Sequence, residues 1–167
     1  IHVMEEYDED LDQMLFYLPL AGSAFKKVYY DENLQRAVSK FVAPEDLIVP
    51  YYTTDLESCP RITHVIKMPE NEVKKLQAIG FYRDVRVADG NSSSDASGVK
   101  EEIERLEGME PSYDTGEVSN LYEVHCNLDL EGFEDVNAEG EYTEVKLPYI
   151  VTIDSNSENI LAIRRNF

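Results

Sequence analysis

The sequence predicts an α+β fold, with about three short helices on or beside a mostly antiparallel β-sheet. Near the C-terminus, two apolar, β-branched runs, Lys146–Asp154 and Ile160–Asn166, flank a polar loop, which is typical of a β-hairpin. Leu121–Leu130 alternates apolar and polar residues, as expected of a strand in an antiparallel sheet with one solvated face. Apolar residues that recur at helical spacing elsewhere in the chain predict the helices.

The N-terminal region predicts a helix followed by two strands. Apolar residues recur at steps of three and four over Met4–Leu18, and Pro19 and Gly22 are expected to end this helix. Ala24–Tyr30 and Leu34–Val42 then predict two strands joined by a polar turn.

The middle of the chain predicts two further strands and a second helix. Leu47–Val49 and Ile62–Met68 are the strands, separated by a loop between Pro50 and Pro60. Pro69 suits the first position of a helix and Gly80 suits its left-handed exit.

A Ser/Gly-rich stretch, residues 89–98, predicts a flexible linker, because it contains no apolar residue larger than Ala that could anchor it. It lies inside a segment, 86–119, that we expect to be variable and to contain a short acidic helix with Val99, Ile103 and Leu106 on one side. The next strand should bury Tyr122 and the apolar residues that alternate with it. The side chains expected to be buried are Tyr122, Val124, Cys126 and Leu128, and those expected to be exposed are Glu123, His125 and Asn127.

The length and charge of the chain limit the number of domains and the kinds of partner that we expect. A chain of 167 residues is expected to form a single domain, 1–167, with a substantial core. The formal net charge is −19, and residues 101–145 hold 15 acidic residues and one base, Arg105. Such a chain repels nucleic acid on average, so we expect no direct binding to duplex DNA. No apolar run approaches the length of a membrane span, so no membrane partner is expected.

No catalytic, cofactor-binding or metal-binding residues are predicted. The two cysteines, Cys59 and Cys126, lack metal or redox spacing, and a free, buried Cys126 is favoured over a disulfide. His125 adjoins Cys126, but neighbours on a strand point to opposite faces, which argues against a catalytic pair. His64 lies on an apolar strand face, where a hydrogen-bonded core histidine is the more common finding than a ligand.

Four phrases, in order, resemble one family. They are Pro19–Asp31 (PLAGSAFKKVYYD), Phe41–Pro50 (FVAPEDLIVP), Glu123–Phe133 (EVHCNLDLEGF), and Leu147–Ile153 with Ile163–Asn166. Together they resemble the portal proteins of tailed bacteriophages, the short-tailed-phage type in particular. The chain, which starts at Ile1 and stops just after a basic pair, is then expected to be an internal fragment of the wing region.

The resemblance implies a structural protein of the virion, from a phage or prophage, assembled in the host cytoplasm. Portal proteins form a homo-oligomeric ring, usually a dodecamer, at one capsid vertex, where it serves DNA packaging and ejection. The implied partners are other portal subunits, capsid protein, the terminase that packages DNA, and tail or adaptor proteins. The family itself hydrolyses nothing, so no enzyme activity is implied.

The acidity leaves an alternative open. An acidic adaptor, or a DNA mimic that binds a basic protein, would have the same charge without the portal phrases. The sequence that follows Phe167 in the gene discriminates the two, since a portal continues into long helices that form the channel.

Overall fold

The computed structural model describes residues 6–31, 34–87 and 118–166. The chain divides into two compact units, Ile1–Ile48 and Val49–Phe167. Among the described residues there are seven strands, two α-helices and a short 3-10 helix, and all strand pairs named below are antiparallel. The α+β class with mostly antiparallel sheets is therefore confirmed. The linker and the third expected helix lie outside the described residues, and the single domain stays a prediction.

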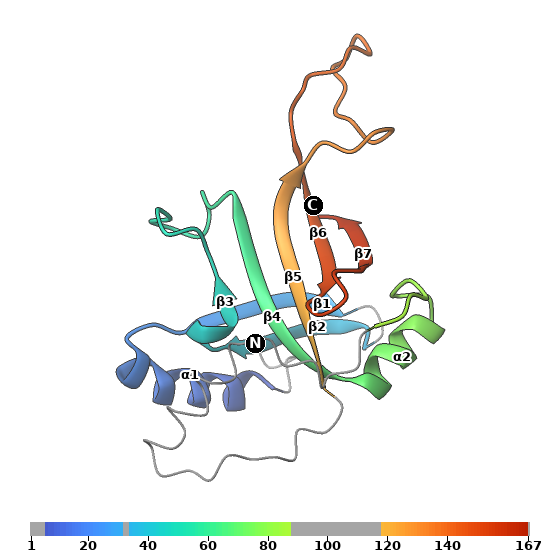
Figure 1. Cartoon of the computed structure of the whole chain (residues 1–167). Coiled ribbons are helices and arrows are strands. Elements are labelled where there is room, and N and C mark those ends of the chain that lie inside the picture. The colour runs from blue at the N-terminus through green and yellow to red at the C-terminus, as the bar shows by residue number, and fades with distance from the viewer. Residues whose placement is uncertain (1–5, 32–33, 88–117, 167) are drawn as a thin grey trace. The chain divides into compact units, whose positions relative to one another are not determined.

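The first unit is a helix beside a β-hairpin (Figure 1). Its elements are α1 (Tyr7–Ala21), β1 (Phe25–Asp31), β2 (Arg36–Val42), a 3-10 helix (Pro44–Asp46) and β3 (Leu47–Ile48). A local hydrogen bond stabilises the hairpin, since the Asp31 carboxylate at the end of β1 accepts the Leu34 N–H at 3.1 Å. The ring of Tyr17 on α1 packs on that of Phe41 on β2, with centroids 5.4 Å apart.

The end of α1 differs from the prediction. Pro19 was expected to stop the helix, but it lies inside, and the helix continues to Ala21. Proline removes one backbone hydrogen bond from a helix. Because Pro19 lies in the last turn of α1, the helix tolerates this loss. Gly22 ends α1 as predicted, with φ of 75° and its N–H donating to the Leu18 carbonyl at 2.9 Å.

The second unit is built on an antiparallel sheet with helix α2 at its side (Figure 1). Its elements are β4 (Arg61–Pro69), α2 (Glu70–Ala78), β5 (Val118–Leu128), β6 (Leu147–Asp154) and β7 (Ile160–Arg165). β4, β5, β6 and β7 are neighbours in that order. Gly80 adopts the left-handed conformation predicted for the exit of α2, with φ of 78°.

The core of the second unit lies between α2, the segment after it and one face of the sheet. Its buried members are Val73, Tyr82, Leu121, Leu161 and Ala162. Val85 and Val87 pack against them from the segment that follows α2. Backbone bonds fix this segment, since the Phe81 and Tyr82 N–H groups both donate to the Leu76 carbonyl.

The predicted faces of β5 are wrong at its N-terminal half. Leu121 is fully buried, whereas Tyr122, expected in the core, is 36% exposed. The register explains the difference, because Leu121 lies opposite Ile66 of β4, on the face that α2 covers. Further along β5, Glu123 and His125 are half-buried rather than exposed, Val124, Cys126 and Leu128 are also half-buried, and Asn127 is exposed as expected.

Candidate functional site

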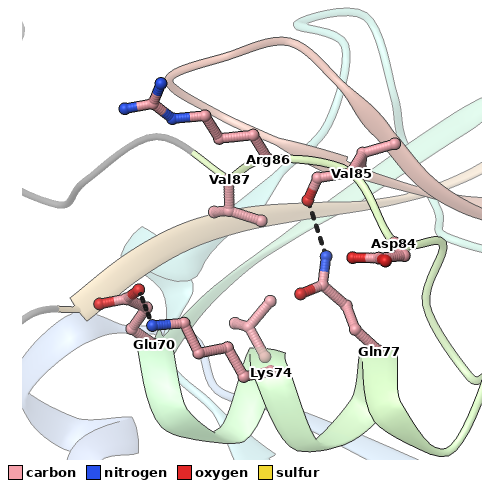
Figure 2. A pocket seen from close by; sticks show the side chains of 8 residues that line it. Glu70, Lys74, Gln77, Asp84, Val85, Arg86 and Val87 are labelled. Atoms are coloured by element: carbon pink, nitrogen blue, oxygen red, sulfur yellow. Dashed lines mark hydrogen bonds and ion pairs between the residues drawn. The ribbon is translucent and has the colours of Figure 1, made fainter.

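A shallow hollow of about 380 Å³ lies between α2 and the segment after it (Figure 2). Its apolar part is formed by Val73, Val85 and Val87. On its rim, Lys74 forms an ion pair with Glu70 one turn earlier. Glu70 and Lys74 therefore neutralise each other at the edge of the hollow.

Gln77 shows what the polar groups of the hollow do. Its amide nitrogen donates to the Val85 carbonyl at 2.8 Å and to the Arg83 carbonyl at 3.0 Å (Figure 2). The amide thus fastens the segment after α2 to the helix. Asp84 and Arg86 line the same hollow, and none of its eight lining residues is a serine, threonine, cysteine or histidine.

A row of polar side chains crosses the covered face of the sheet beside the core. His125 Nε2 lies 2.8 Å from Glu123 Oε1, so these two form a hydrogen-bonded pair. His64 on β4 and Thr152 on β6 lie directly opposite Glu123 in the register. The sequence reasoning missed this pairing, because it assigned Glu123 and His125 to the solvated face.

Tyr82 joins this row from the segment after α2. Burial raises the pKa of the Tyr82 hydroxyl, the Glu123 carboxylate raises it further, and a hydrogen bond with Thr152 acts in the opposite direction. A tyrosine that stays protonated is suited to hydrogen bonding inside the core. No group of three or more His, Cys, Asp and Glu residues within the described segments is placed to hold a metal ion.

Both cysteines are free thiols, as predicted for Cys126. Burial raises the pKa of the Cys126 thiol, so it is less reactive than an exposed cysteine. It is half-buried rather than fully buried. The thiol of Cys59 donates to the Arg61 carbonyl at 3.0 Å, which ties the loop to the start of β4.

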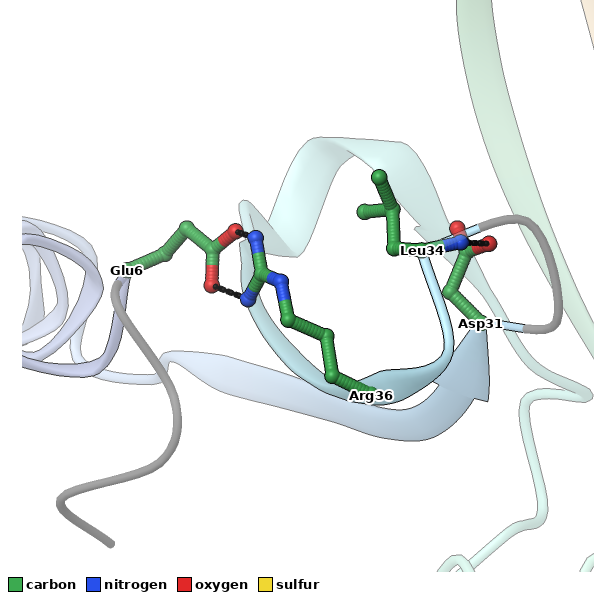
Figure 3. A network of polar contacts seen from close by, with 4 residues as sticks. All are labelled: Glu6, Asp31, Leu34 and Arg36. Atoms are coloured by element: carbon green, nitrogen blue, oxygen red, sulfur yellow. Dashed lines mark hydrogen bonds and ion pairs between the residues drawn. The ribbon is translucent and has the colours of Figure 1, made fainter.

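The first unit contains a polar contact of a different kind (Figure 3). Arg36 at the start of β2 forms a two-bonded ion pair with Glu6, just before α1, and its Nη1 donates to Oε2 at 2.6 Å. This hydrogen-bonded guanidinium lowers the pKa of Glu6 to about 2. The pair connects the start of the helix to the hairpin, and the charged groups of Glu6 and Arg36 bind each other.

The most unusual feature of the first unit is its exposed apolar surface. No residue of α1 is fully buried, and Phe16 and Leu20 are each 72% exposed. On β1, Val28 and Tyr30 are each 60% exposed. Large apolar side chains gathered on one small unit mark an interaction surface rather than a catalytic one.

The sequence contained a signal for this surface. Leu15 and Leu18 belong to the apolar repeat that predicts a helix over Met4–Leu18, yet both are exposed. Together with Phe16 and Leu20, they form an apolar surface that extends around most of the C-terminal half of α1. A helix that packs on one side needs only a narrower apolar stripe.

No family model matches the chain, and no curated protein matches it.

Among the helices that the structure describes, none is long and apolar enough to cross a membrane.

Proposed function

We propose that this chain is a structural part, the wing region, of a tailed-phage or prophage portal protein. Its role would be to build a ring that serves as the DNA entry and exit channel at the capsid vertex, in the virion. The ring would also dock the packaging terminase and the tail. In this proposal the chain itself catalyses nothing.

The observation that carries the proposal is the exposed apolar surface of α1 and β1. Phe16, Leu20, Val28 and Tyr30 are each at least 60% exposed. Burying an apolar side chain of this size contributes roughly 1.5–3 kcal/mol, so four left in water are a considerable cost for a chain acting alone. A subunit of a larger assembly has a reason to keep such residues at its surface.

The resembling phrases fall on the secondary structure of both units. The phrase Pro19–Asp31 covers the end of α1 and all of β1, and Phe41–Pro50 covers the end of β2 through β3. Glu123–Phe133 begins within β5, and the two parts of the fourth phrase fall on β6 and on the end of β7. The likeness therefore concerns the framework of the chain, and the variable segment 86–119 falls mainly outside the described residues.

The acidic loop between β5 and β6 favours a structural role over DNA mimicry. The Glu134 carboxylate accepts the Gly132 N–H at 2.9 Å, and Asp135 accepts the Thr143 hydroxyl at 2.6 Å. The bond from the Gly132 N–H also lowers the pKa of Glu134. These carboxylates stabilise their own loop, whereas a mimic would need rows of them free to meet a basic partner. The acidic adaptor remains the second candidate because of the net charge of −19.

The proposal is tested by expressing the gene that encodes this chain in full and mixing the product with a phage terminase. A portal should form a defined oligomer that binds the terminase, with no ATPase activity of its own. A product that remains monomeric and instead binds one basic protein would favour the adaptor.

A further inference from the structure

The connection between β5 and β6 extends beyond the end of the sheet (Figure 1). We call residues 129–145 of this connection the arm. It is much longer than the roughly two to five residues of most β-hairpin loops. Connections of more than about 12–15 residues are uncommon in compact domains, and an ordered one usually has a function. Hydrogen bonds within the arm give it a definite shape, so its faces can be compared.

Two backbone hydrogen bonds fold the middle of the arm into a small hairpin. The Asn137 N–H donates to the Glu141 carbonyl at 2.9 Å, and the Thr143 N–H donates to the Asp135 carbonyl at 3.1 Å. The side chains of the same residues also bind each other. The Thr143 hydroxyl donates to the Asp135 carboxylate at 2.6 Å, and Asn137 Nδ2 donates to the Glu141 carboxylate at 3.4 Å. One face of the small hairpin is therefore polar.

The opposite face of the small hairpin is apolar and uncovered. Val136 and Tyr142 form an antiparallel bridge between the two backbone bonds, so their side chains lie next to each other. Side chains alternate along a strand, which places this pair on the face away from the polar one. Val136 is 53% exposed and Tyr142 is 70% exposed.

The backbone groups of the same two residues point to the outer edges of the small hairpin. Val136 and Tyr142 lie between the hydrogen-bonded positions, and in such a pair each N–H and C=O is directed away from the opposite strand. In the part of the chain that the structure describes, no hydrogen bond uses these groups. An open strand edge of this kind can pair with another extended segment.

The charge of the arm indicates the chemistry of that segment. Residues 129–145 include seven acidic residues and no base. Glu134 and Asp135 are half-buried, and the other acidic residues are exposed. We propose that the arm binds an extended segment of a second, basic protein, which adds to it as a further strand. Addition of a strand to an exposed edge is a common mode of peptide recognition.

The two faces of the arm also define the sequence pattern of the partner segment. A strand presents alternate side chains to opposite faces. On one face, apolar side chains of the partner would cover Val136 and Tyr142. On the other face, lysine or arginine side chains would lie beside Asp135 and Glu141, and opposite charges on neighbouring strands attract. The partner segment therefore alternates apolar and basic residues.

Charge argues against a second copy of this chain as the occupant. Two arms placed side by side would bring acidic residues together, and like charges opposite each other destabilise a strand pair. The net charge of −19 opposes association of whole chains as well. The contact also involves a single strand, so it differs from mimicry of a DNA duplex. It does not depend on the proposed function, because a portal subunit and an acidic adaptor can each present such an arm.

The first test titrates a labelled synthetic peptide that alternates valine and lysine into the 167-residue chain at about 0.15 M salt. The control peptide has the same composition, with all its lysines at one end, so that it keeps the charge and loses the alternation. Fluorescence anisotropy should show several-fold tighter binding of the alternating peptide. Equal affinity of the two peptides, or no binding of either, would overturn the proposal.

Matched substitutions then test whether the peptide binds at the arm. Tyr142→Ser removes one member of the apolar pair and should weaken binding several-fold, whereas Tyr142→Phe keeps the ring and should bind as the wild type does. Tyr51→Ser is the control, because Tyr51 is fully exposed in a different loop, and it should leave binding unchanged. Equal effects of Tyr142→Ser and Tyr51→Ser would overturn the proposal.

Charge reversal separates the arm from the general acidity of the chain. Glu141→Lys should weaken binding of the alternating peptide several-fold. Glu57→Lys makes the same change at an exposed glutamate outside the arm and should have a smaller effect. Equal losses in the two variants would show that net charge alone attracts the peptide, and would overturn the proposal.

Light scattering of the chain without peptide tests the remaining occupant. The wild type and Tyr142→Ser should have the same mass. Dimers of the wild type that Tyr142→Ser abolishes would assign the apolar pair to a second copy and would overturn the proposal. None of these measurements requires a ring, so they can fail or succeed separately from the full-length oligomer that tests the proposed function.

Discussion

Glu6 and Arg36 make the start of α1 sensitive to acid. The usual pKa of a glutamate is 4.5, and the Arg36 guanidinium lowers that of Glu6 to about 2. Because the folded value is below the unfolded one, the pair stabilises the fold above about pH 4.5 and loses this effect as the pH falls toward 2. Stability measured by urea unfolding should therefore differ between the wild type and Glu6→Gln at neutral pH and converge near pH 2.

The matched control for this pair is Glu9→Gln, an exposed carboxylate on the same helix. It should leave the pH dependence close to that of the wild type. A Glu6→Gln variant whose stability falls with acid as steeply as the wild type would contradict the assignment.

Leu121 and Tyr122 test which face of β5 is the core. Leu121 is fully buried beside Leu161, so Leu121→Ala should destabilise the protein by about 2–5 kcal/mol. Tyr122 is partly exposed, so Tyr122→Ala should cost about 1 kcal/mol, the centre of the range for point mutations. Chemical unfolding of both variants measures the difference. A larger loss of stability for Tyr122→Ala than for Leu121→Ala would instead support the buried face that the alternation in the sequence predicts.

At the scale of elements, Asp154 holds the turn between β6 and β7. It is fully buried, and its Oδ2 accepts the Ser157 N–H at 3.0 Å and the hydroxyl of the same residue. Asp154→Ala should cost about 1–3 kcal/mol, because the half-buried Ser157 donors lose their acceptor. Asp154→Asn keeps an acceptor oxygen and should cost less. Equal losses of thermal stability in the two variants would argue against this role.

Strand positions could be predicted from the sequence because each strand carries its own local signal. Predicted Ile62–Met68 is observed as Arg61–Pro69, and predicted Ala24–Tyr30 as Phe25–Asp31. Which face is covered depends on distant segments instead. Leu121 is buried because α2 and Tyr82 happen to lie over it, and no spacing within β5 contains that information.

The irregularity between β6 and β7 could not be predicted either. The register shifts between Thr152 and Ile153, so that Thr152 pairs with Ala162 and Ile153 with Ile160. Leu161 falls at this shift and is fully buried in the core. The exposed surface of α1 was missed for a similar reason, since an apolar stripe in a sequence does not state whether its own chain covers it.

At the scale of the whole molecule, several cations of the described chain are engaged locally. Lys75 Nζ lies 2.5 Å from Glu72, Lys74 pairs with Glu70, and the Arg164 guanidinium lies 3.3 Å from the Phe81 ring centroid. Non-specific DNA binding commonly draws on about six to ten phosphate contacts. Titration of labelled duplex should therefore show no binding near physiological salt. Micromolar affinity would mean that the basic pairs gather into one patch.

The central claim is that this chain is one sector of a ring. Electron microscopy of the full-length gene product tests it most directly. We expect closed rings around an axial channel, with the density of this chain's β4–β7 sheet repeated once per subunit outside the channel. Particles that are monomeric, or assemblies without a channel, would contradict the account.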